Sequence, residues 1–105
     1  MVVVNGFNVY PHEVEAVLLA HPGLAAAAVV GQADPRRGQV LVAAVVLAAG
    51  QQVTEAELIA HCRKSLAAFK VPLRVSTLAQ LPLTPTGKVS RSALRRRLDQ
   101  ENTNV

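Results

Sequence analysis

The apolar residues of the chain gather in short runs separated by polar turns, and these runs predict a small sheet. Residues 24–30 and 40–47 are almost wholly apolar and short, which favours buried strands over helices. The run at 40–47 is apolar on both faces, so we expect it at the centre of the sheet. Residues 31–39 are expected to form a loop between these strands, and a third strand is expected at residues 74–81.

The start of the chain predicts a hairpin followed by a helix. Residues 2–10 have high strand propensity, and Asn5-Gly6 interrupts them with a dipeptide typical of tight hairpin turns. Pro11 suits the first position of a helix, and the acidic residues that follow suit the positive end of the helix dipole. This helix is expected to end at residues 21–23.

Two more helices are predicted on either side of the third strand. Thr54 and Glu57 form a capping box that starts the second helix, which reaches about residue 70 and must stop before Pro72. Residues 82–88 contain two prolines and a glycine and are expected to be irregular. A last helix is expected to follow, with Ser90 as its cap. The predicted fold is α+β: a small mixed sheet of about three strands with flanking helices, preceded by an N-terminal β-hairpin.

The composition allows one compact domain with an aliphatic core. The chain has 105 residues, half of them hydrophobic, and its aromatic residues are Phe7, Tyr10 and Phe69. The apolar stretch at residues 40–49 is too short to span a bilayer. Cys62 is the single cysteine, so no internal disulfide can form, and its place in an apolar helical stripe predicts a core thiol. A reducing, cytoplasmic setting is the simplest expectation.

Positive charge gathers towards the C-terminal end. The formal net charge is +4, and five basic residues lie within ten positions: Lys88, Arg91, Arg95, Arg96 and Arg97. Such a cluster suits nucleic acid, acidic lipid or a phosphorylated small molecule, or is simply a solvated helix face. A nucleic-acid-binding module is disfavoured, because no aromatic residue for base stacking lies near the arginines. A free-standing adaptor that docks through its strand edges is the other alternative.

Lys88 is the residue best placed for chemistry. It lies on a loop stiffened by Pro82 and Pro85, and Gly87 beside it leaves room for a ligand to approach. The loop is not a phosphate-binding P-loop, which needs glycine at position 82 and serine or threonine at position 89. A lysine can bridge phosphate and carboxylate oxygens, but its charge is effective only in a closed site. Lys88 therefore needs a second protein surface.

The other residue types that carry chemistry form no recognisable site. His12, His21 and His61 lack the spacing of metal ligands, so no metal site is predicted and these histidines are expected at the surface or at helix ends. No combination of serine, histidine and aspartate suggests a nucleophilic triad. The chain by itself is thus expected to hold no complete active site.

Three stretches of the sequence resemble a known family: VNGFNVYPHEVEAVLLAHPGLAAAAVVGQADPRRGQVLVAAVVL, ELIAHCRKSLAAFKVP and LPLTPTGKVSRSALR. In order and spacing they resemble the small C-terminal domain of acyl-CoA synthetases, over residues 2–98. These enzymes belong to the adenylate-forming superfamily, with the adenylation domains of nonribosomal peptide synthetases and firefly-type luciferases. The resemblance implies that an acid and MgATP give an acyl-adenylate and pyrophosphate, and that CoA then displaces AMP. It also implies that the small domain rotates between the two steps.

The resemblance assigns the adenylation step to the loop at residues 82–88. Lys88 matches the catalytic lysine, which bridges the carboxylate of the acid and the α-phosphate region. Pro85, Thr86 and Gly87 match the loop that supports this lysine. The family also implies that bacterial acetyltransferases modify the lysine, which would remove its charge. An acetyltransferase is therefore an expected partner at Lys88.

The resemblance assigns the thioester step to the N-terminal turn. Gly6 and Phe7 match the loop that enters the site with CoA, and Gly6 is expected beside the path of the pantetheine. Lys70 and Arg74 are candidates for contacts with the CoA nucleotide. Glu13 matches an acidic residue of the family whose role is mainly structural.

The resemblance also bears on the rest of the protein. The family's hinge residue precedes the first strand, so Met1 is expected to be internal and residues 1–105 to be the C-terminal mobile domain of an enzyme whose large N-terminal domain is absent here. The stretch NVYPHEVE, with Pro11, looks more like acyl- and aryl-CoA ligases than peptide synthetase domains. A fatty acid is expected as substrate only from family frequency, because the acid pocket lies in the large domain. Whether the acceptor is CoA or a carrier protein stays open.

Overall fold

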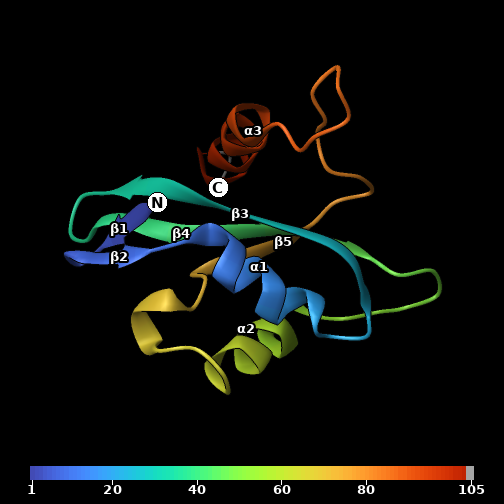
Figure 1. Ribbon diagram of the computed structural model, residues 1–105, viewed down its shortest axis with the longest axis horizontal. Coiled ribbons are helices and arrows are strands. Elements are labelled where there is room, and N and C mark those ends of the chain that lie inside the picture. Colours follow the sequence, from blue (N-terminus) through green and yellow to red (C-terminus); the bar gives the residue numbers. More distant parts are fainter. Residues whose placement is uncertain (104–105) are drawn as a thin grey trace.

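The computed structural model describes residues 1–103 and contains three α-helices and one five-stranded sheet in that part of the chain (Figure 1). The elements follow in this order: β1 (Val2–Val4), β2 (Phe7–Val9), α1 (Pro11–Leu19), β3 (Leu24–Asp34), β4 (Gly38–Leu47), α2 (Glu55–Arg63), the 3-10 helix η1 (Ala68–Lys70), β5 (Arg74–Thr77) and α3 (Arg91–Thr103). The predicted α+β class is confirmed. No helix among residues 1–103 is long and apolar enough to cross a membrane.

The sheet is open and mixed, with β4 at its centre as predicted. β3 runs antiparallel to β4 along its whole length, while β1 and β5 both pair with β4 as well. β5 is parallel to β4, and β1 joins it antiparallel at Val4 and Gly38. The N-terminal hairpin therefore does not merely precede the sheet but forms part of it. β3 is an edge strand, because β4 is its one partner among the described strands.

Several predicted boundaries differ from the structure. Residues 31–39 were expected to be a loop, but β3 continues to Asp34 and β4 begins at Gly38. Strand pairing overrides the local glycine signal here, and the one buried polar side chain of this segment, Gln32, donates a hydrogen bond to Asp99 Oδ1 at 2.6 Å. The second helix ends at Arg63 instead of residue 70, and η1 follows separately. The third strand ends at Thr77, four residues early.

The two faces of the sheet carry separate apolar layers. α1 and α2 cover one face, and α3 covers the other (Figure 1). Successive side chains of β4 point to opposite faces of the sheet and so contribute to both layers. Leu41 and Ala43 face α1 and α2, whereas Val40 and Val42 face α3. Cys62 of α2 is fully buried in the layer on the α1 and α2 side of the sheet, which confirms the predicted core thiol, and burial raises the pKa of this thiol.

Two predicted helix caps are present. Thr54 Oγ1 accepts a hydrogen bond from the backbone N–H of Glu57 at 3.1 Å, at the start of α2. Ser90 Oγ accepts one from the N–H of Ala93 at 3.3 Å, at the start of α3. The second cap matters for the site, because it begins the helix directly after the loop that carries Lys88.

Candidate functional site

Residues 82–90 form a small hairpin instead of the irregular loop that was expected. The N–H of Gly87 donates to the carbonyl of Thr84 at 2.9 Å, and the N–H of Thr84 donates to the carbonyl of Lys88 at 2.7 Å. At the base, the N–H of Ser90 donates to the carbonyl of Pro82 at 2.8 Å. These bonds close a three-residue loop of the kind that joins a turn to a left-handed glycine. The prolines therefore shape a turn and do not prevent pairing.

Side chains and backbone conformation make the tip of this hairpin stiff. Pro85 occupies the second position of the turn, where its restricted φ is suitable. Gly87 has φ of +86°, a value that disfavours any residue with a Cβ, although open space surrounds it. Thr84 Oγ1 accepts a hydrogen bond from the N–H of Lys88 at 3.2 Å and lies 3.0 Å from Thr86 Oγ1. The glycine is thus required by conformation more than by room.

The side chain of Lys88 projects from this stiff tip into solvent. The residue is exposed, and no carboxylate in the described part of the chain forms an ion pair with it. Charge placed on a rigid backbone without a partner is available for a ligand that another surface brings. Lys88 is thus an exposed cation without an ion-pair partner among the described residues, at the end of a hydrogen-bonded hairpin.

The Lys88 hairpin is one constellation of candidate residues, and the N-terminal turn with its neighbours forms a second. Asn5 and Gly6 have φ of +51° and +82°, as the predicted two-residue hairpin turn requires. The N–H of Asn5 donates to the carbonyl of Arg37 at 3.0 Å, which ties the turn to the short loop between β3 and β4. Phe7, 54% exposed, stacks on Phe69 of η1 with 4.4 Å between ring centroids. Phe69 was not among the predicted site residues.

The structure brings Lys70 to this constellation but not Arg74. Lys70 Nζ lies 2.8 Å from Glu13 Oε1, so η1 is tied to α1, and Glu13 has the structural role that was expected. Val75 packs beneath α1 and α2, so alternation turns its neighbour Arg74 towards the opposite face of the sheet. Arg74 Nη2 is buried there without a hydrogen-bond partner among the described residues.

A groove of about 440 Å³ lies beside the N-terminal turn. Its walls include Asn5 of the turn, Phe69 of η1 and two basic side chains that sequence reasoning missed, Arg37 and Arg63. Nη1 of Arg37 lies 3.9 Å from Asp34 Oδ2, and no carboxylate in the described region pairs with Arg63. The groove therefore combines an aromatic face with two guanidinium groups, which suits a phosphorylated ligand.

The two constellations lie at opposite ends of the domain. In Figure 1 the Lys88 hairpin projects beyond α3 at the top right, and the turn between β1 and β2 lies at the far left. The hairpin continues into α3 on one face of the sheet, whereas η1 and the groove adjoin α2 on the other. One surface docked against the domain cannot easily cover both.

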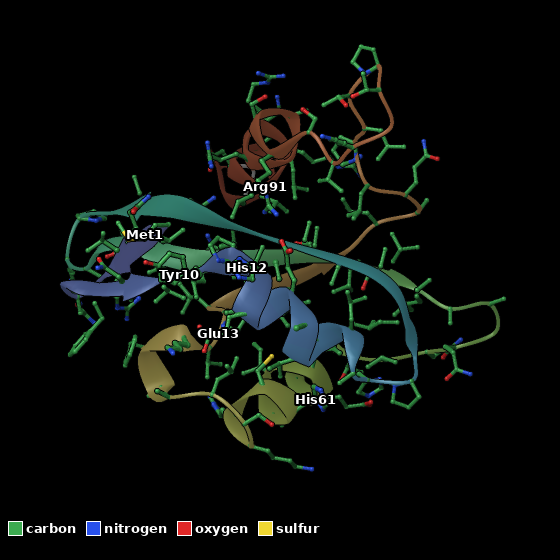
Figure 2. All side chains as sticks on the ribbon, viewed as in Figure 1. Met1, Tyr10, His12, Glu13, His61 and Arg91 are labelled. Atoms are coloured by element: carbon green, nitrogen blue, oxygen red, sulfur yellow. The ribbon has the colours of Figure 1, made fainter. Side chains whose placement is uncertain are left out.

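The histidines make structural contacts. His21 Nδ1 accepts a hydrogen bond from the N–H of Gly23 at 3.0 Å, and His61 Nε2 donates to the carbonyl of Val17 at 2.7 Å. His61 lies on α2, on the side that faces α1 (Figure 2). Among residues 1–103, no cluster of histidine, cysteine or carboxylate side chains could hold a metal ion.

Known proteins share both the sequence and the fold. A model of the AMP-binding enzyme C-terminal domain matches residues 13–88. A feruloyl-CoA synthase of an Amycolatopsis species is 44% identical over 97 residues, which are 92% of this chain and 20% of that protein. A 2-succinylbenzoate–CoA ligase of Bacillus cytotoxicus is 44% identical over 101 residues, 96% of this chain and 21% of that protein.

A solved structure agrees equally well. The amide bond synthetase McbA of Marinactinospora thermotolerans superposes with a TM-score of 0.88 at 41% identity, over 91% of this chain and 19% of that chain. This chain therefore spans about a fifth of the length of the relatives it matches. By sequence and by fold, it belongs to the family of AMP-binding enzyme C-terminal domains.

Proposed function

We propose that the chain is the C-terminal domain of an acid–CoA ligase that forms AMP, and that Lys88 serves its adenylation step. The observation that carries the proposal is the stiff hairpin, which holds an unpaired ammonium group away from the body of the domain. A large N-terminal domain of the same enzyme is the partner that would close over this tip. Neither the adaptor nor the nucleic-acid alternative has a comparable observation in its favour.

In the first step, a carboxylate oxygen of the acid attacks the α-phosphorus of ATP, and pyrophosphate leaves. Lys88 would bridge the carboxylate and an α-phosphate oxygen, drawing together two anions that repel each other. In a closed site such stabilisation is worth several kcal/mol, on the order of 3. Because the described residues offer no metal site, Mg²⁺ enters this proposal only as the ion that accompanies the phosphates of ATP.

In the second step, the CoA thiol attacks the acyl carbonyl, loses its proton and expels AMP. The Gly6–Phe7 turn would line the pantetheine path, and the neighbouring groove would hold the CoA nucleotide. Arg37 and Arg63 supply charge for its phosphates, and Phe69 offers a face for stacking. Lys70 borders this region while paired with Glu13, whereas Arg74 lies on the other face and is not part of the proposal.

The acid and the acceptor are less closely defined. The relatives described above are named for ferulic and 2-succinylbenzoic acids, and neither is a fatty acid. Other relatives, 45% and 37% identical, are named for fatty acids, so the relatives single out no one acid and we propose only a carboxylic acid. One structural relative is an amide bond synthetase, so CoA as acceptor is also part of the proposal. Acetylation of Lys88 by an acetyltransferase would remove the charge and stop the first step.

The experiment uses the complete protein that carries this chain. Acid-dependent exchange between ATP and pyrophosphate is measured across a panel of aliphatic and aromatic acids, for the wild type and for Lys88→Ala. Thioester formation from a preformed acyl-adenylate is measured in parallel. We expect Lys88→Ala to lower exchange at least about 100-fold and to change the second step little. Undiminished exchange in Lys88→Ala would overturn the proposal.

A further inference from the structure

Arg91, the first residue of α3, reaches across the edge of the sheet to two partners. Its Nη1 donates to the carbonyl of Val29 at 2.7 Å and to Glu15 Oε2 at 3.0 Å, and its Nη2 lies 3.4 Å from Glu15 Oε1. Glu15 Oε2 also accepts the N–H of Val29 at 2.7 Å. Figure 2 shows Arg91 between α3 and β3, on the side where α1 begins. One ion pair thus joins α1, β3 and α3.

This ion pair takes the place of a neighbouring strand at Val29. β3 is an edge strand, and the N–H and carbonyl of Val29 both point away from β4 to meet Glu15 and Arg91. Glu15 is 14% exposed and Arg91 45%, so the carboxylate is largely shielded from water. A bidentate guanidinium in such surroundings has a preferred direction that a single lysine would lack.

The contact removes Arg91 from the basic cluster that the sequence suggests. Its guanidinium is engaged with a carboxylate and a carbonyl, and is therefore not available to bind a polyanion. The exposed arginines Arg96 and Arg97 of the same helix make no such contact with β3. The contacts of Arg91 instead fix the position of a neighbouring segment of the chain.

The element that Arg91 holds in place is the base of the Lys88 hairpin. Arg91 follows Lys88 by three residues, and Ser90 between them is bonded to Pro82 at the base of the hairpin. Leu94 and Leu98 anchor α3 by apolar contacts, which have no preferred direction, and the hydrogen bond from Gln32 to Asp99 holds the helix two turns after Arg91. The contact between Glu15 and Arg91 restrains the rotation of α3 at the first residue of the helix. Because the hairpin is stiff, a small rotation there would displace Lys88.

We propose that Glu15 and Arg91, which both form hydrogen bonds with the backbone of Val29, are positioning residues. They set the orientation of the Lys88 hairpin for adenylation. This inference rests on the proposed function. Neither side chain needs to touch substrate. Misplacement of a catalytic group by about 1 Å costs up to roughly 100-fold in rate, so loss of the contact should lower kcat of the adenylation step more than it changes KM for the acid or for ATP.

The test compares Arg91→Met, Glu15→Gln and the double variant in the complete protein, with Arg96→Met as the matched control on the exposed side of α3. Pyrophosphate exchange and thioester formation from a preformed acyl-adenylate are measured separately, and thermal unfolding reports folding. Glu15→Gln is the milder variant, because its amide oxygen can still accept the N–H of Val29. Wild type and Lys88→Ala are measured beside them.

We expect Arg91→Met to lower kcat of exchange roughly 10- to 100-fold and to change the second step less than about twofold. The double variant should be no worse than Arg91→Met, since the two residues act as one unit. Equal losses in both steps would show a merely structural role and overturn the inference, as would normal exchange in Arg91→Met while Lys88→Ala is inactive. Normal exchange in Lys88→Ala would instead overturn the proposed function itself.

Discussion

Phe7 and Phe69 stack with their ring planes only 20° apart, although one follows the N-terminal turn and the other lies in η1. The stack places a rigid aromatic surface beside the groove that contains Arg37 and Arg63. It also couples the position of the Gly6 turn to η1, which the pair of Lys70 and Glu13 ties to α1. The N-terminal turn is therefore held in place by side-chain contacts to η1 and, through η1, to α1.

Loss of the stack should affect the thioester step selectively. An aromatic pair contributes about 0.5–1.5 kcal/mol beyond its burial, so Phe7→Leu should slow thioester formation from preformed acyl-adenylate roughly 2- to 10-fold. Pyrophosphate exchange should stay near wild type, because the turn is remote from Lys88. Tyr10→Leu, which removes another exposed aromatic ring of the same segment, is the control. A loss confined to exchange would contradict the assignment of the turn.

The groove predicts an effect that depends on the phosphates of the acceptor. Arg63→Ala should raise KM for CoA roughly 5- to 10-fold, because a charge-assisted hydrogen bond is worth about 1.5–3 kcal/mol and the groove is partly open to water. With pantetheine, which lacks the nucleotide, the variant should match wild type. Lys64→Ala removes a neighbouring exposed charge and should change neither. An equal loss with both acceptors would place Arg63 outside the nucleotide site.

Backbone conformation at the hairpin tip predicts a local effect. Gly87→Ala forces a Cβ into a conformation with φ of +86°, at a cost of about 1 kcal/mol. Gly50→Ala carries a similar strain, with φ of +76° and open space around it, but lies on the loop after β4. We expect Gly87→Ala to lower pyrophosphate exchange several-fold and Gly50→Ala to leave it unchanged. Comparable thermal unfolding of both variants would show that the difference is local.

The buried thiol predicts both low reactivity and a dependence on pH. Burial raises the pKa of Cys62 above the ordinary value of 9.0, so the native protein holds this proton more tightly than the unfolded chain. Its contribution to the free energy of unfolding is therefore complete below pH 9 and declines as pH rises above that value. Urea unfolding between pH 7 and pH 10 should show this decline in wild type and a smaller one in Cys62→Ala. A thiol reagent that reacts rapidly with the native protein would contradict the burial.

The sequence predicts features whose signals are local. Asn5-Gly6 predicts its turn because both residues tolerate positive φ, and Thr54 predicts its helix because the capping partner lies three residues away. The strand at the centre of the sheet is predicted because β4 is apolar on both faces. Lys88 stands out because its turn residues are adjacent to it.

Features that depend on distant partners could not be predicted. The hairpin at residues 82–90 is a different case: its hydrogen bonds are local, and it was missed because two prolines and a glycine are typical of irregular segments. Arg37 and Arg63 are far apart in the sequence, and only the folded groove brings them together. Arg91 looked like one more arginine of a basic run, because its contacts with Glu15 and Val29 come from two earlier elements.

The placement of the two tips at opposite ends of one small domain has a consequence for chemical access. Under the proposed function, engagement of the Gly6 turn with the rest of the enzyme would leave the Lys88 hairpin, at the opposite end of the domain (Figure 1), in water, and the reverse would hold during adenylation. An amine-directed reagent, or an acetyltransferase, would thus meet Lys88 only during part of each turnover. ATP and acid together would shield the lysine, and CoA would uncover it. The rate at which Lys88 reacts would then report which half of the proposed cycle the enzyme occupies.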